Sequence, residues 1–281
     1  MKISIVIPVY NEAEHLGACL QAIAAQTVQP FEVIVVDNNS TDSTAAVAEG
    51  FPFVRLLRQC RQGVVYARDC GFDAATGDII GRLDADSLIA PDWVASVQQL
   101  FAEDDSLSAV TGKVRYYGMS ASWLLDAIDL RLRRRLARLL DREVAAQGAN
   151  MALRHSSWQA VRPQLCRRGG MHEDHDLAIH LTETGHRVTF DERLEAAIDC
   201  RRIEASWPEF CHYAWLSPKT YALHELRSRR HMYPVVAFVI ACYPLLRFLH
   251  RGYDSRTARF SWRQLLTPIE SPRVNPATFV D

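Results

Sequence analysis

Lysine is scarce in this sequence, and its cysteines are not closely paired along the chain. Only three of the 32 basic residues are lysines, and 33 acidic residues bring the net charge to -1. This balance provides no polycationic surface, which excludes a general affinity for nucleic acid. The seven cysteines are odd in number and include no CxxC pair. They exclude a disulfide framework and a zinc ribbon, and they favour a reducing compartment.

The sequence also lacks a signal peptide and a long apolar run. Residues 1–4 lead directly into a strand-like stretch, without the basic, apolar and small-residue order of a signal peptide. The longest uncharged apolar run covers 232–246 and is interrupted by Pro234 and Pro244. Because it is shorter than the roughly 20 residues that cross a bilayer, we expect a cytoplasmic protein.

Strand and helix patterns alternate along the first hundred residues. Short β-branched runs predict buried strands, and apolar residues at helical spacing predict the helices between them. This alternation favours βαβ units around a mostly parallel sheet, in an α/β fold. The predicted strands cover 3–8, 31–36, 53–57 and 78–83, and the predicted helices cover 11–26, with Asn11 as N-cap, 64–75 and 91–101.

The pattern changes after residue 105. From 207 to about 250 the sequence predicts helix, broken near Pro218 and Pro234 because proline has no N–H to donate. We expect one compact body over 1–204, followed by a helical extension over 205–281. The other elements predicted in this half are strands at 108–114, 148–153, 188–190 and 194–198, and helices at 123–140 and 175–184.

Polar side chains follow three of the first four predicted strands. In open parallel sheets, ligands bind at the carboxyl ends of the strands, so these segments predict one common site. The segments are Tyr10-Asn11-Glu12, Asp37 to Asp42 and Asp84-Ala85-Asp86.

Asp84 and Asp86 are the strongest candidates for a metal site. Two carboxylates one residue apart at a strand end can both face a hard cation, and Mg²⁺ or Mn²⁺ takes one or two carboxylates together with substrate phosphates. The alternative is a solvated acidic turn in which Ser87 and Asp92 cap the next helix.

Three further polar segments each allow two interpretations. Asp37 could read a base or ribose edge, or begin a helix-starting turn. Arg68, one turn into a glycine-led helix, could lie near a diphosphate or on the surface. The titratable residues 172–176 precede a predicted helix, whose dipole alone favours acids there. A metal site in 172–176 is disfavoured because its ligands would be adjacent rather than four residues apart.

Taken in order, these segments resemble the motifs of the family 2 glycosyltransferases. The resemblance covers about residues 2–200 and implies the GT-A fold, a Rossmann-like, mostly parallel sheet flanked by helices, here with a helical C-terminal tail. Residues 1–104 would then form the nucleotide-sugar-binding half and residues 105–204 the acceptor half. The matching segments are 4–12, 35–42, 67–71, 84–86 and 173–177.

The resemblance implies an inverting transfer of one sugar from a nucleotide diphosphate, with uridine expected, to a hydroxyl of a saccharide or lipid-linked acceptor. Asp174 would be the general base, Asp37 would bind the nucleotide base, and Asp84 and Asp86 would hold Mn²⁺ or Mg²⁺ on the diphosphate. The remaining residues implied for the nucleotide-sugar pocket are Pro8, Tyr10, Glu12, Arg68 and Asn150, together with Asp84.

Two departures from the family pattern affect these expectations. Many relatives carry a histidine about 25 residues after the base, as a further metal ligand, whereas this chain has Ile198 to Arg202 there. Either Asp199 substitutes, or Arg201 or Arg202 neutralises the diphosphate, or the metal has fewer protein ligands. The Gln-x-x-Arg-Trp signature of processive synthases is absent, which favours addition of a single sugar.

Three rival functions are weighed against this one. A sugar nucleotidyltransferase would show a glycine-rich loop with a basic residue after the first strand, and this chain has none before Gly17. A nucleotide-sugar-binding module without turnover is disfavoured because both Asp86 and Asp174 are present. A hydride-transferring Rossmann enzyme is disfavoured because no GxGxxG follows the first strand.

Two segments suggest a membrane surface. Helix 123–140 is amphipathic and rich in arginine, and Arg227, Arg229 and Arg230 stand directly before the apolar run. A basic cluster beside an apolar segment too short to span is typical of a peripheral anchor, which would place the enzyme at the cytoplasmic face of a membrane through 123–140 and 227–250. The alternative is that both segments pack on the body of the protein or on a second copy.

Overall fold

The protein folds around one mixed sheet of eight strands. The computed structural model describes residues 1–118, 122–139, 146–167, 169–226, 229–254, 259–263 and 265. The strands of the sheet are β1 (Ile3–Val9), β2 (Glu32–Asp37), β3 (Val54–Arg58), β4 (Ile79–Leu83), β5 (Leu88–Ile89), β6 (Leu107–Tyr117), β7 (Asn150–Arg154) and β8 (Arg187–Asp199), and a small separate ribbon pairs β9 (Tyr253–Asp254) with β10 (Arg259–Phe260).

The strand order across the sheet is β3-β2-β1-β4-β7-β6-β8-β5. Strands β1 to β4 are parallel to one another, β7 is antiparallel to both of its neighbours, and β6 and β8 run parallel. The parallel half confirms the predicted βαβ units, and the chain order reverses between β1 and β4, where such sheets bind ligands.

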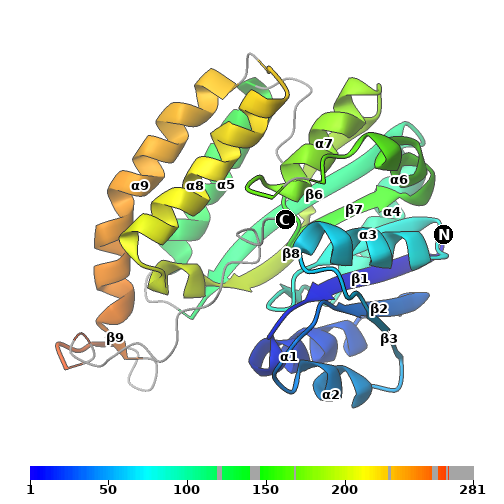
Figure 1. Ribbon diagram of the computed structural model, residues 1–281, viewed down its shortest axis with the longest axis horizontal. Helices are drawn as coiled ribbons and strands as arrows, with labels where there is room; N and C mark the ends of the chain where they lie inside the picture. The colour runs from blue at the N-terminus through cyan, green and yellow to red at the C-terminus, as the bar shows by residue number, and fades with distance from the viewer. Residues whose placement is uncertain are drawn as a thin grey trace.

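Helices cover both faces of the sheet, with α5, α8 and α9 gathered on one flank (Figure 1). The alternating side chains of the strands divide the core between the two faces: Ile5 and Ile7 of β1 pack with α1 and α4, and Val6 packs with α3, α6 and α7. The helices are α1 (Ala13–Ala24), α2 (Thr44–Glu49), α3 (Val64–Ala74), α4 (Trp93–Glu103), α5 (Ser122–Leu139), α6 (His155–Val161), α7 (Glu173–Glu183), α8 (Trp207–Leu223) and α9 (Arg229–Arg251), with short 3-10 turns η1 (Arg162–Gln164) and η2 (Cys200–Glu204).

Local details differ from the sequence predictions at three places. Asn11 is not the N-cap of α1: its φ is 52°, and its side-chain oxygen accepts a hydrogen bond from the Thr41 N–H, so it joins two loops instead. The strands predicted at 188–190 and 194–198 are one continuous strand, β8, with a register irregularity opposite Gly112. Helix α7 begins two residues before its predicted start, which brings Glu173 and Asp174 into its first turn.

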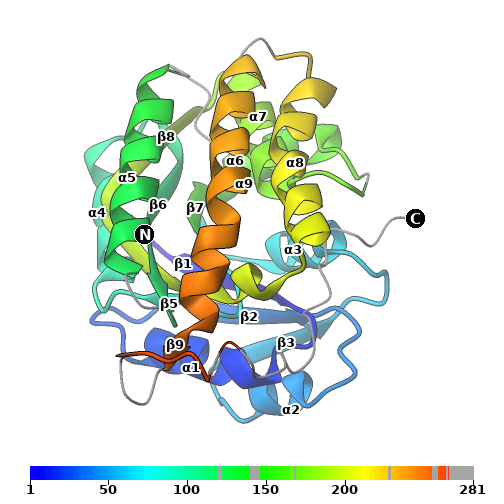
Figure 2. The same ribbon diagram turned by 90° about the vertical axis from the view of Figure 1, so that its left-hand side faces the viewer.

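The three flank helices form a layer of their own. Figure 2 shows α9 in front, with α5 on one side and α8 on the other. Tyr243 of α9 is buried; its ring stacks on Phe210 of α8 at 3.8 Å, and its hydroxyl donates to the Ile203 carbonyl of η2 at 3.0 Å. The C-terminal helices α8 and α9 are therefore joined to η2, which follows the last strand of the sheet.

The predicted breaks at Pro218 and Pro234 are wrong. Pro218 lies inside α8 and Pro234 and Pro244 inside α9, each helix continuing at the cost of a missing N–H donor. The expectation that the apolar segment is too short to span is also wrong by length and composition, since 230–251 forms a 22-residue helix. An 18-residue window of this helix has a mean hydropathy of 1.8, and 17% of that window is buried. Arg227 lies outside the described residues.

Gly71 permits the close approach of α3 to the sheet and provides a stability test. A Cβ at this position would lie 2.3 Å from Cγ1 of Val6 and 2.9 Å from Cγ2 of Val36. Overpacking of this kind costs about 1–3 kcal/mol, so we expect Gly71→Ala to lower the free energy of unfolding in a denaturant titration. The matched control is Gly17→Ala in α1, where the nearest side-chain atom is 3.8 Å away. That variant should be neutral or stabilised by up to about 1 kcal/mol through helix propensity, and equal loss in both variants would contradict the packing argument.

Candidate active site

A cleft of roughly 800 Å³, partly open to solvent, lies at the carboxyl ends of β1 and β4. The lining comes from both halves of the chain, and brings together most segments that the sequence singled out. The residues that line it are Pro8, Val9, Tyr10, Glu12, Asn38, Val64, Ala67, Arg82, Asp84, Ala85, His172, Glu173, Asp174, Arg202 and Tyr213.

The end of β1 supplies one wall of the cleft. Pro8, Tyr10 and Glu12, which the sequence analysis expects in a nucleotide pocket, all line this cleft. Asp37, at the end of β2, is 7% exposed and is not among the lining residues; one of its carboxylate oxygens accepts a hydrogen bond from the Ser40 N–H at 3.1 Å. Its neighbour Asn38 lines the cleft instead. The prediction that Asp37 binds a nucleotide base therefore stays a prediction.

Arg82 is the charged centre of the site. It stands in the otherwise apolar β4, 4% exposed, with its guanidinium 2.7 Å from Oε1 of Glu173 and 3.2 Å from Oδ1 of Asp84. Burial would lower the pKa of Arg82, but these carboxylates and Asp174 raise it above its ordinary value. Its charge is therefore permanent, and it connects the end of β4 to the start of α7.

Gly148 makes room for this arginine. A Cβ at position 148 would lie 0.8 Å from Nη1 of Arg82, so no other residue fits there without displacing the guanidinium. The Gly148 N–H, in turn, donates to Oδ2 of Asp174 at 2.8 Å. The segment before β7 thus fixes both the arginine and the carboxylate.

Asp174 is held as an ionised carboxylate. Its second oxygen accepts the N–H of His175 at 2.8 Å. Burial would raise the pKa of Asp174, but the two neighbouring imidazoles, Arg82 and the Gly148 N–H hold it below its usual range. Since burial lowers the pKa of both His172 and His175, these rings are neutral near pH 7, and Arg82 and the N–H donors carry the effect there. Each oxygen keeps a further lone pair with which it can accept a proton.

An aromatic and cationic wall faces the carboxylates. Tyr213 of α8 packs edge to face against His172 with ring centroids 4.8 Å apart, and the Arg202 guanidinium lies 3.6 Å from the centre of the Tyr213 ring. Both Arg202 and Tyr213 line the cleft, so the C-terminal helical region supplies part of the site. A cation here can neutralise a phosphate, which matches one of the alternatives raised for 198–202.

The Asp84–Asp86 turn is tightly positioned. Ser87 Oγ accepts the Asp84 N–H and donates to the Ala149 carbonyl, and the Tyr117 hydroxyl donates to the Asp86 carbonyl at 2.9 Å. Asp84 lines the cleft with its side chain 43% exposed, whereas Asp86 is 7% exposed and is not among the lining residues.

Asp199 belongs to the same edge. Tyr117 lies opposite Asp199 in the pairing of β6 with β8, and its hydroxyl donates to the Asp86 carbonyl. The Asp199 carboxylate also lies 3.3 Å from Nε2 of His15. Carboxylate oxygens of this kind are the ligands that Mg²⁺ or Mn²⁺ prefers, but among the described residues Asp84, Asp86 and Asp199 are not gathered closely enough to form a ready ligand group.

The prediction that Arg68 faces the nucleotide is wrong. Its side chain is fully buried, donating to Oδ1 of Asp69 and to the Glu173 carbonyl at 2.8 Å. It therefore supports the start of α7 from below, and none of its guanidinium reaches the cleft.

The prediction that Asn150 lies in the nucleotide-sugar pocket is wrong for the same reason. The side chain is fully buried in the sheet, where its oxygen accepts from Trp93 Nε1 at 2.8 Å and its NH₂ donates to the carbonyls of Lys113 and Leu194. All three bonds join strands and helix α4, so the residue has a structural role.

Sequence reasoning missed Arg82 and Asn38. Arg82 could have been found because it is the one charged residue in the strand Ile79–Leu83, and a charge in a buried strand requires a partner of opposite charge. Asn38 donates to the carbonyls of Gln59 and Arg61 and accepts the Gly63 N–H, which no local pattern reveals.

Comparison with known proteins gives a consistent result. The family model described as glycosyl transferase family 2 matches residues 4–161. A curated relative, glycosyltransferase AglE of Haloferax volcanii, is 27% identical over 198 residues, covering 67% of this chain and 64% of the relative. The chain spans from 31% to 64% of the length of the first three curated relatives that it matches.

Solved structures share the fold. The mannosyltransferase PcManGT from Pyrobaculum calidifontis, solved with GDP-Man and Mn²⁺, has a TM-score of 0.64 at 19% identity, over 94% of this chain and 77% of that one. Glucosyl-3-phosphoglycerate synthase from Mycobacterium tuberculosis, solved with Mn²⁺, UDP and phosphoglyceric acid, has a TM-score of 0.53 at 18% identity, over 70% of each chain.

Burial of His172 predicts a pH-dependent stability. Burial lowers the pKa of His172 to about 3, against about 6.5 in an unfolded chain. Between these values the unfolded state binds the extra proton, so this histidine's contribution to stability is present above about pH 6.5 and is lost as the pH falls. We expect His172→Gln to flatten the pH dependence of the unfolding free energy by up to about 1.4 kcal/mol per pH unit between pH 6.5 and 4. His212→Gln, at an exposed site in α8, should keep the wild-type slope; an unchanged slope in His172→Gln would contradict the assignment.

Proposed function

The chain belongs to glycosyl transferase family 2, and on that premise we propose that it transfers one sugar from a nucleotide diphosphate to a hydroxyl acceptor with inversion at the anomeric carbon. The observation that carries the proposal is the meeting of Asp84, Arg82 and Asp174 on one cleft at the carboxyl ends of β1 and β4. Two carboxylates with different surroundings, one more exposed and one held by N–H donors, suit a metal-assisted leaving group and a base.

The donor would lie along the β1 side of the cleft. Pro8, Tyr10 and Glu12 would contact the nucleotide, and Asp37 would bind the base beside Asn38. Uridine is the expected nucleoside, supported by the UDP complex of the synthase; the GDP-Man complex of PcManGT keeps guanosine as the alternative. Arg202 would neutralise part of the diphosphate charge from the opposite wall.

A divalent cation would be held at the Asp84–Asp86 edge. Asp84 and Asp86 would be its ligands, with Asp199 in the place of the missing histidine. When bound, Mn²⁺ or Mg²⁺ stabilises the charge that the leaving diphosphate gains. The Mn²⁺ in both structural neighbours supports this choice of ion.

Asp174 would act as the general base. As the acceptor oxygen attacks the anomeric carbon, its proton passes to the carboxylate, while the bond from that carbon to the diphosphate oxygen breaks. The Gly148 and His175 N–H groups orient the carboxylate for this transfer. A single displacement of this kind inverts the anomeric centre and needs one base.

The rival functions fit the site less well. A binding module without turnover has no need for a buried carboxylate fixed by two N–H donors. A sugar nucleotidyltransferase would need a basic, glycine-rich loop after β1, where this chain has Tyr10 and Glu12.

The donor site can be tested by calorimetry with UDP, GDP and dTDP, each with and without Mn²⁺. We expect one nucleotide to bind tightly only with Mn²⁺, and Asp86→Ala to lose the metal-dependent part. Asp174→Asn should bind that nucleotide as tightly as the wild type does. Turnover is measured as the nucleotide released from the corresponding nucleotide sugars in the presence of acceptor saccharides, and in this variant it should be about 10²–10⁴-fold slower.

Asp92→Asn is the matched control, because Asp92 is exposed six residues after Asp86 and its side chain makes no capping hydrogen bond. It should leave both binding and turnover unchanged. Normal turnover in Asp174→Asn would remove Asp174 as the base, and unchanged metal dependence in Asp86→Ala would remove the metal assignment.

We further propose that the acceptor is lipid-linked and that α9 contacts the cytoplasmic face of a membrane. Residues 1–204 would then be the catalytic domain and 205–281 the associating extension. Phe238 and Leu245, seven residues apart on one face of α9, are 50% and 62% exposed. Basic residues of α5 support surface attachment, although Arg134 is paired with Glu192 of β8 at 2.6 Å.

Vesicle co-sedimentation tests this contact. The protein should bind vesicles of phosphatidylcholine with anionic lipid, and the double variant Phe238→Ser/Leu245→Ser should bind at least about tenfold more weakly, since two apolar side chains no longer leave water. Phe31→Ser, at a 49% exposed site before β2, is the control. Absence of wild-type binding, or equal binding by all three proteins, would rule out a membrane contact through α9.

A further inference from the structure

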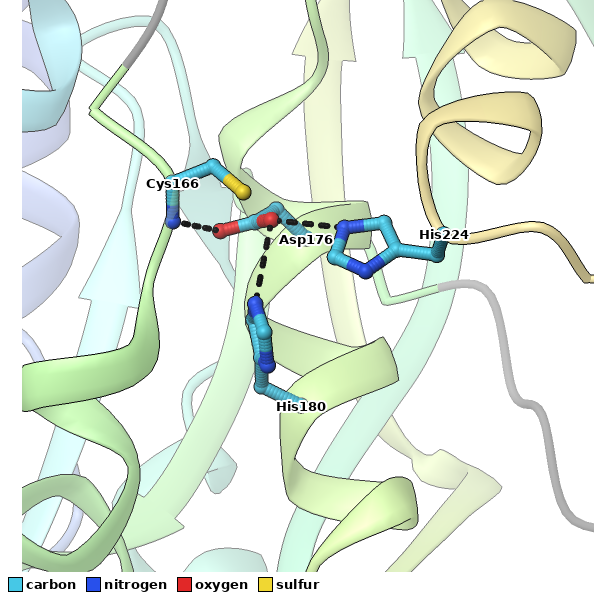
Figure 3. A group of neighbouring side chains, drawn as sticks. All are labelled: Cys166, Asp176, His180 and His224. Carbon is cyan, nitrogen blue, oxygen red and sulfur yellow. Dashed lines mark hydrogen bonds and ion pairs between the residues drawn. The ribbon is translucent and has the colours of Figure 1, made fainter.

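A second group of metal-ligand side chains lies behind the cleft. Asp176 and His180 are four residues apart on α7, Cys166 stands in the segment before α7, and His224 caps the end of α8. One ligand atom from each of the four lies within 4.8 Å of all the others. Figure 3 shows the thiol, the carboxylate and the two imidazoles pointing toward one another.

The distances are close to those around a tetrahedral ion. Ligand bonds of about 2.0–2.3 Å place neighbouring ligand atoms about 3.3–3.7 Å apart in a tetrahedral zinc site. Oδ1 of Asp176 lies 3.6 Å from Nε2 of His180 and 2.8 Å from Nε2 of His224. The first distance already fits, and the second needs a small rotation of the His224 ring.

His180 gives independent evidence of an additional partner. Among the described residues, neither of its ring nitrogens has a hydrogen-bond partner, although both are buried. A buried polar atom without a partner costs about 1–3 kcal/mol, so such atoms call for an explanation. A cation bound by Nε2 would supply one.

We propose that Cys166, Asp176, His180 and His224 bind a structural zinc ion, separate from the divalent cation at Asp84 and Asp86. One sulfur, two nitrogens and one carboxylate oxygen form a mixed soft and borderline set, which favours Zn²⁺ over Mg²⁺ or Mn²⁺. Four protein ligands leave no open position for substrate, as in sites that stabilise a fold. On binding, the Cys166 thiol loses its proton to solvent and the imidazoles bind as neutral rings.

The surroundings suit this role. The Cys166 N–H donates to Oδ2 of Asp176 at 3.1 Å, which leaves Oδ1 on the side of the histidines. Oε2 of Glu183 lies 3.7 Å from Nδ1 of His180, where it can orient the ring with Nε2 toward the ion. A carboxylate behind a ligating imidazole is a common second layer of zinc sites.

The consequence of the ion is a fixed joint between α7 and α8. Asp174 lies half a turn before Asp176 on α7, and Tyr213 lies on α8, so the zinc ion would hold the base and the aromatic wall at a constant separation. The proposed site differs from the zinc ribbon that the cysteine spacing excludes, because it uses one cysteine and an Asp–His pair at i, i+4 of α7.

The test uses the full chain without a polyhistidine tag. The protein is dialysed first against a buffer that contains zinc and then against metal-free buffer, which removes unbound zinc. Elemental mass spectrometry should find about one zinc ion per chain. Replacement by Co²⁺ should give visible d–d bands of tetrahedral cobalt and a thiolate-to-cobalt band in the near ultraviolet. Both readouts are independent of transferase activity and of the fate of any variant.

Cys166→Ser should lose the near-ultraviolet cobalt band, His224→Gln should lose the zinc, and Glu183→Gln should bind zinc about tenfold more weakly. Controls are Cys60→Ser and His212→Gln, both at exposed sites, and Asp86→Ala, and all three should keep the ion.

The melting temperature of chelator-treated wild type should rise when zinc is added. A wild type that binds no zinc, or zinc that stays in His224→Gln with the thiolate band intact in Cys166→Ser, would overturn the proposal.

Discussion

The site depends on one positive charge placed inside the sheet. Arg82 stands where an apolar side chain would continue β4, and a buried charge is tolerated only with partners. Asp84 and Glu173 provide them, and Gly148 provides the space. Because these contacts come from β4, from the segment before β7 and from α7, the arginine fixes the relative positions of three segments that are far apart in the sequence.

Much of the fold and part of the site could be predicted from the sequence, for an identifiable reason. Strand runs such as Ile3–Val9 and Ile79–Leu83 are local signals, and the polar residues that follow them must lie at one edge of a parallel sheet. Tyr10, Glu12, Asp84 and Asp174 were placed on the cleft by this logic and by the family resemblance.

The failures share a different physical origin. Arg68 and Asn150 carry polar groups that suit a ligand equally well, and only the tertiary contacts with Glu173, Trp93 and Leu194 turn them inward. Likewise, Pro234 lowers helix propensity and removes one N–H donor, yet α9 continues through it. Which polar group faces the solvent is decided by partners that no local pattern names.

The distribution of the cleft along the chain has a consequence for synthesis. Its lining begins at Pro8 and ends at Tyr213, on a helix that follows the entire sheet. A growing chain therefore cannot complete the donor pocket while the sheet alone has emerged, even if the βαβ half has already folded. Until α8 reaches its place, the nascent protein carries the carboxylates and Arg82 without the wall that faces them, so maturation of the active site waits for the synthesis of α8.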